Sequence, residues 1–123
     1  MNNDRLKKIL ICNTEEDIRE SLKLILSDHY DLILTDSGEQ CLECLEHDQA
    51  IGLVLLDIKI PKVNGLETLT AIKEKKPGIK IIMVAGYKSS EAAAESAFAQ
   101  TADYIVKPFK SEEILNSVRK KIG

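Results

Sequence analysis

The chain of 123 residues contains no tryptophan, and only 4% of its residues are aromatic. Its longest apolar runs are about five residues, far short of the ~20 that a membrane-spanning helix requires. The first eight residues, MNNDRLKK, lack the apolar core of a secretory signal peptide. We therefore expect a cytoplasmic protein that does not enter a membrane.

An excess of basic residues is also missing. The 17 lysines and arginines are outnumbered by 20 aspartates and glutamates, which gives a net charge of -3. Binding to nucleic acid depends on a basic surface, so we expect no nucleic-acid binding by this domain.

Cysteines are few, and the three of them are an odd number in a chain without an export signal. Reduced thiols are expected. Cys41 and Cys44 have CxxC spacing, but no second CxxC follows, and His29 and His47 are isolated. Core packing is therefore favoured over redox or metal chemistry, which stays open as the alternative.

What the chain does contain is typical of one soluble domain with an aliphatic core. Hydrophobic residues make up 44% and charged residues 30%. A length of 123 residues matches a single domain, so we predict one domain over residues 1–123.

Short apolar runs alternate with amphipathic segments five times along the chain. The predicted strands are 8–12, 32–35, 52–56, 80–84 and 104–106. The predicted helices are 15–28, 38–47, one from about 66 that ends before Pro77, one from Ser89 or Ser90 to about Gln100, and one from Ser111. Parallel strands must be joined through such helices, so the pattern predicts an α/β fold. The expected architecture is a doubly wound, five-stranded parallel sheet flanked by five helices.

Two helix caps can be predicted from single polar residues. Thr14 is well placed to cap the first helix, and Ser37 to cap the second. Gln40 stands at the position of a capping box with Ser37.

In sheets of this kind, function gathers at the carboxyl ends of the strands. Asp57 directly follows the apolar run 52–56, and Lys107 follows the strand 104–106. An acid and a base on facing strand ends form either a structural ion pair or a working site. Spacing alone leaves both interpretations open.

Two stretches then become recognisable. LVLLDIKIPKVNGLE (53–67) and DYIVKPF (103–109) resemble the receiver domain of two-component response regulators. ILICNTE (9–15) resembles the family's opening ILIVDDE in position but not in charge. The resemblance covers nearly the whole chain and implies a flavodoxin-like (βα)5 fold.

The resemblance implies a phosphorylation switch in a phosphorelay, and not an enzyme. Asp57 would accept a phosphoryl group from a histidine kinase or phosphotransfer protein, and Lys107 would contact it. Tyr104 matches the aromatic switch position, although a plain strand aromatic explains it equally well. The face of the fourth helix, fifth strand and fifth helix would meet a downstream partner or output domain.

The departures from the family concern the metal. The family's acidic pair falls on Asn13 and Thr14, which are neutral. In receivers, Mg2+ is bound directly by the second residue of this pair, by the phosphoacceptor and by the backbone carbonyl at the position of Lys59, and it strongly favours carboxylates. Weak Mg2+ binding is therefore expected. Glu15 could contribute through a water, and the Lys59 side chain could neutralise Asp57 or simply be solvated.

A further departure is Ala85, which replaces the Thr or Ser that follows the phosphoryl group in receivers. Two hypotheses result. Either the chain is a receiver with weakened Mg2+-dependent phosphorylation of Asp57, or it is a non-phosphorylated pseudo-receiver that acts as a constitutive interaction module. An unrelated flavodoxin-like enzyme is disfavoured, because the sequence has no GxGxxG, no P-loop and no Ser–His arrangement.

Overall fold

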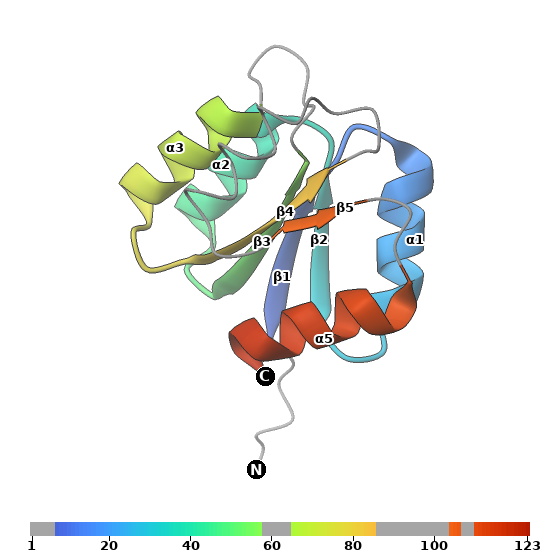
Figure 1. Ribbon diagram of the computed structural model, residues 1–123. Coiled ribbons are helices and arrows are strands. Elements are labelled where there is room, and N and C mark those ends of the chain that lie inside the picture. Colours follow the sequence, from blue (N-terminus) through green and yellow to red (C-terminus); the bar gives the residue numbers. More distant parts are fainter. Residues whose placement is uncertain (1–6, 58–64, 86–103, 107–109) are drawn as a thin grey trace.

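The computed structural model describes residues 7–57, 65–85, 104–106 and 110–123. Five strands form one parallel sheet in the order β2-β1-β3-β4-β5 (Figure 1). The strands are β1 (Lys8–Cys12), β2 (Asp31–Thr35), β3 (Ile51–Asp57), β4 (Lys80–Ala85) and β5 (Tyr104–Val106). The predicted doubly wound sheet is confirmed, with the chain starting at β1 and building outwards in both directions.

Four helices lie in the described part of the chain: α1 (Glu16–Leu26), α2 (Gly38–His47), α3 (Gly65–Lys75) and α5 (Ser111–Ile122). Figure 1 shows α1 and α5 on one face of the sheet and α2 and α3 on the other. The helix predicted between β4 and β5 falls outside the described residues. No helix in the described segments has the length and apolar character needed to cross a membrane.

The sheet is buried on both faces, and the alternation of side chains along β1 shows how. Ile9 and Ile11 point into the core under α1 and α5, whereas Leu10 and Cys12 point into the core under α2 and α3. A strand covered on both sides must be apolar along its buried part, which explains the continuous run ILIC at residues 9–12.

The predicted cap of α2 is confirmed. The Ser37 hydroxyl accepts a hydrogen bond from the Gln40 backbone N–H at 3.2 Å. The Gln40 side chain accepts from the backbone N–H of Asp36 at 3.0 Å, one residue before the position that a capping box requires.

The predicted cap of α1 by Thr14 is wrong. The helix begins after Glu15, whose side chain makes no capping hydrogen bond. The preceding turn is held by Asn13, whose Oδ1 accepts the backbone N–H of Glu15 at 2.9 Å. Asparagine side chains commonly bond the backbone two residues ahead, and here this bond is made just before the helix begins.

Two smaller differences from the prediction concern the ends of two strands. Asp57 and Ala85 are the last residues of their strands and do not follow them.

Candidate functional site

Asn13 and Asp57 lie side by side at the carboxyl edge of the sheet. Cys12 of β1 pairs with Leu56 of β3 in parallel register, so the next residue of each chain segment is a neighbour of the other. Both side chains are buried, Asn13 with 2% and Asp57 with 6% of its surface exposed. The edge therefore combines one buried carboxylate with one buried neutral amide.

The other neighbour of Asp57 is also neutral. Asp57 pairs with Val84 of β4, and the next residue, Ala85, pairs with Val106 of β5. The chain continues from Val106 to Lys107, which lies outside the described residues. The register thus places the ends of β1, β3, β4 and β5 in one row, as the sequence predicted.

Asn13 is fixed in this row by three hydrogen bonds. Its Oδ1 accepts the N–H of Glu15 at 2.9 Å, and its own N–H donates to the carbonyl of Thr35 at 3.1 Å. The guanidinium of Arg19 donates to the Asn13 carbonyl at 2.7 Å. The amide oxygen that would face a metal is therefore already used to shape the turn into α1.

Arg19 was missed by sequence reasoning. It lies in the second turn of α1 and brings a cation next to the backbone of the site. A basic residue near a helix amino terminus is disfavoured by the helix dipole. That unfavourable placement is the sequence signal that could have indicated a specific contact.

The remaining predicted site residues differ in burial and in their distance along the chain from the strand ends. Thr14 is half-buried and Glu15 is exposed, both directly after Asn13. Tyr104 is the first residue of β5, two residues before Val106, which belongs to the row. Lys59, like Lys107, lies outside the described residues.

The described donors fit Mg2+ poorly. Mg2+ demands near-octahedral oxygen coordination and is bound through carboxylates. Asp57 is the buried carboxylate of this edge, whereas the Asn13 oxygen is engaged by Glu15 and Thr14 offers a hydroxyl. Across the described segments, no group of three His, Cys, Asp or Glu side chains could hold a metal ion.

A pair of buried thiols lies directly behind the edge. Hydrogen bonding to Cys41 lowers the pKa of the Cys12 thiol, although burial and the charges of Asp57 and Asp36 act in the opposite direction. The same contact, together with burial, strongly raises the pKa of Cys41. The influence of Asp57 on Cys12 places the acid within electrostatic reach of this pair.

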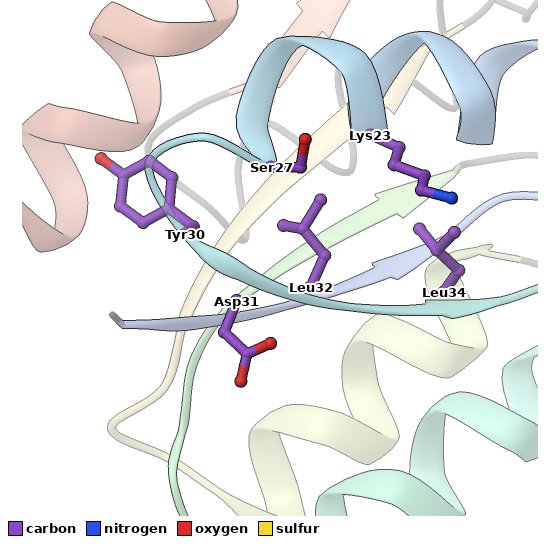
Figure 2. A pocket seen from close by; sticks show the side chains of 6 residues that line it. All are labelled: Lys23, Ser27, Tyr30, Asp31, Leu32 and Leu34. Atoms are coloured by element: carbon purple, nitrogen blue, oxygen red, sulfur yellow. The ribbon is translucent and has the colours of Figure 1, made fainter. Parts of the chain in front are cut away.

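A separate groove of about 500 Å³ runs between α1 and the edge strand β2. Its lining residues are Lys23, Ser27, Tyr30, Asp31, Leu32 and Leu34. Figure 2 shows Leu32 and Leu34 pointing from β2 towards α1, while Asp31 points to the opposite side. Neither Asn13 nor Asp57 lines this groove, so the candidate site stays at the strand ends.

Comparison with known proteins points to one family. Residues 9–119 match the model of the response regulator receiver domain. The response regulator protein FleR of Pseudomonas aeruginosa is 30% identical over 113 residues, which are 90% of this chain and 24% of FleR. The CAI-1 autoinducer sensor kinase/phosphatase CqsS of Vibrio cholerae is 32% identical over 91% of this chain and 17% of its own length. The chain thus spans a quarter or less of these two relatives.

Solved structures agree with the fold. A CheY-like response regulator receiver domain protein from Methanospirillum hungatei is 34% identical, with a TM-score of 0.84 over 94% of this chain and 93% of that one. The receiver domain of NtrX from Brucella abortus is 29% identical, with a TM-score of 0.86 over 93% of this chain and 97% of that one.

Proposed function

The chain belongs to the family of response regulator receiver domains of two-component signalling, and from this premise we propose that Asp57 is a phosphoacceptor with weak Mg2+-dependent phosphorylation. The observation that supports this proposal is the row of strand ends, where the buried Asp57 carboxylate lies next to the neutral Asn13 on one side and β4, which ends in Ala85, on the other. Phosphoryl transfer depends on positioning and on neutralising the developing charge, which Mg2+ normally does. A site that holds the cation weakly therefore transfers slowly.

The loss of cation affinity at Asn13 and Thr14 follows from Coulomb's law. Two unit charges ~4 Å apart interact by several kcal/mol at an effective dielectric constant near 20, before desolvation. Replacing two carboxylates with Asn13 and Thr14 removes two such attractions for the cation. Each ~1.4 kcal/mol of lost binding energy is a tenfold loss of affinity, so a partial loss already amounts to orders of magnitude.

The second candidate function is a pseudo-receiver that is never phosphorylated and acts as a constitutive interaction module. It is favoured by the Asn13 side chain, which is neutral and whose oxygen already accepts a hydrogen bond from the backbone of Glu15. Both candidates share the same fold and the same position of Asp57.

The partners differ between the two candidates. For a phosphoacceptor, a histidine kinase or phosphotransfer protein would supply the phosphoryl group to Asp57, and Lys107 would contact it. A downstream partner or output domain would bind at the face of the fourth helix, β5 and α5. Relatives include a sensor kinase/phosphatase and transcriptional regulatory proteins, which supports partners of both kinds.

Acetyl phosphate provides the test. The protein is incubated with acetyl phosphate and Mg2+, and its intact mass is measured for a gain of about 80 Da, one phosphoryl group. We expect little product. Substantial product that disappears in Asp57→Ala would overturn the impaired site, whereas no product even after restoration of the acidic pair would favour the pseudo-receiver.

A further inference from the structure

The three cysteines of the chain meet around α2, although Cys12 is far from the other two in sequence. Cys12 ends β1 and Cys41 lies in α2, and both belong to the same core cluster with 0% of their surface exposed. Cys44, one helical turn after Cys41, is partly buried and packs against that cluster. All three are free thiols.

Cys12 and Cys41 meet at one backbone carbonyl. The backbone N–H of Cys41 donates to the carbonyl of Ser37 at 3.1 Å. The Cys12 thiol also donates to the carbonyl of Ser37 at 3.3 Å, and Ser37 is the cap of α2. Cys12 therefore lies against the first turn of α2, beside Cys41, and each thiol shifts the pKa of the other. Two cysteines placed in this way on different elements are candidates for a disulfide, which requires their Cβ atoms to lie about 4 Å apart.

We propose that Cys12 and Cys41 are an oxidative modification site that closes to an intramolecular disulfide in the presence of a peroxide. In the first step, one thiol attacks hydrogen peroxide, the O–O bond breaks, and a sulfenic acid and one water result. In the second step, the other thiol attacks the sulfenic sulfur, the S–S bond forms, and a second water leaves. Two thiols are oxidised by two electrons in total, and one peroxide is reduced to two waters.

The alternative pair within α2 is less favourable. Cys41 and Cys44 lie on one rigid helix, whose backbone would have to distort before their sulfurs could meet at disulfide geometry. Cys12 belongs to a different element and faces Cys41 from the sheet. The disulfide would tie the end of β1, one residue before Asn13, to α2, and it would remove the thiol donor to Ser37.

The link can be mapped on the folded protein. Wild type and Cys44→Ala are treated with hydrogen peroxide in native buffer, blocked with an alkylating agent and digested without reductant by a protease that cleaves after glutamate. Cleavage after Glu43 separates Cys41 from Cys44. We expect a disulfide-linked product that joins residues 1–15 to residues 40–43 in both proteins. Dithiothreitol should reduce this disulfide and separate the two peptides.

Matched variants decide the assignment. Cys12→Ala and Cys41→Ala should lose the intramolecular product by at least about tenfold, whereas Cys44→Ala should retain it. Circular dichroism verifies that each variant is folded before oxidation. A link between Cys41 and Cys44, a disulfide-bonded dimer, or a Cys12–Cys41 link that forms only in urea would each overturn the proposal.

Discussion

Strands β1 and β3 are neighbours and end at the same edge of the sheet, but the buried polar groups at their ends differ in charge. β3 ends in the Asp57 carboxylate, whereas β1 is followed by the Asn13 amide, and both are almost fully buried. The amide oxygen accepts a hydrogen bond from the backbone N–H of Glu15, as that of a structural residue does. Packing below the edge and charge at the edge are therefore separable, so the fold can be kept while its chemistry changes.

If the two strands are packed equally well, replacing a core leucine by alanine near the end of each strand should lower the free energy of unfolding by the same amount. Leu10 of β1 and Leu56 of β3 are fully buried in one core cluster. We expect Leu10→Ala and Leu56→Ala each to lower the free energy of unfolding by about 2–5 kcal/mol, through lost burial and a residual cavity. Urea unfolding followed by circular dichroism measures both. A loss of less than about 1 kcal/mol in Leu10→Ala would contradict the equivalence of the two strands.

Restoring charge at the end of β1 should produce the next largest effect. We expect the double change Asn13→Asp with Thr14→Asp to raise Mg2+ affinity at least about tenfold, or ~1.4 kcal/mol, because carboxylates then flank Asp57. Without Mg2+, the same protein should be less stable than wild type, because buried like charges repel. Amide chemical shifts of Asp57 during a Mg2+ titration report the binding, since the chain has no tryptophan to quench.

A matched control adds the same charge elsewhere. Gln49→Asp with Ala50→Asp introduces two acids at exposed positions between α2 and β3. This variant should leave Mg2+ affinity near that of wild type. Equal gains in both double variants would point to general electrostatic attraction, and no gain in either would place the defect away from Asn13 and Thr14.

Removing the amide tests its structural role without adding charge. Asn13→Ala deletes the acceptor for the Glu15 N–H, and we expect a loss of about 1 kcal/mol in the free energy of unfolding. Thr14→Ala is the natural control, because the Thr14 hydroxyl makes no hydrogen bond among the described residues, and its cost should stay within about 0.5 kcal/mol. A larger loss of stability in Thr14→Ala than in Asn13→Ala would show that Thr14, and not Asn13, stabilises the turn.

The smallest effect is expected at the opposite end of β1. There the Lys8 ammonium lies 2.6 Å from the Asp48 carboxylate and lowers the pKa of Asp48 below its ordinary value. A lowered carboxyl pKa contributes stability at neutral pH that is lost as the pH falls through the folded-state pKa. The difference in urea midpoint between wild type and Asp48→Asn should therefore shrink from pH 7 towards strongly acidic pH. An unchanged difference would mean that the ion pair adds nothing.

The strands were predictable because a sheet that is covered on both faces requires uninterrupted apolar runs. Residues 52–56 (GLVLL) and 81–84 (IIMV) are such runs. The helices followed from apolar spacing, and α2 was located to the residue because Ser37 is a strong cap. The observed strand ends differ from the predicted ones where a polar residue continues the backbone hydrogen bonding of the strand, as Asp57 does at the end of β3.

The site was only partly predictable. The rule that parallel strands end together predicted the row that contains Asn13, Asp57 and Ala85. This rule does not predict the direction of side chains. The hydrogen bond between the Asn13 oxygen and the Glu15 N–H and the bond from Arg19 to the Asn13 carbonyl were therefore not predicted. The cap assigned to Thr14 failed for the same reason, because Asn13 reaches the backbone first.

Lys7 donates a hydrogen bond to the carbonyl of Ile122, so the beginning of β1 and the last turn of α5 touch at the edge opposite Asp57 (Figure 1). A domain whose first strand and last helix touch in this way can have these two elements joined by a linker and be reopened elsewhere. The exposed bond between Gln49 and Ala50 is a suitable place for the cut. Reporter proteins could be fused at either pair of ends, both remote from the carboxyl edge, which makes this domain a convenient component for engineered sensors.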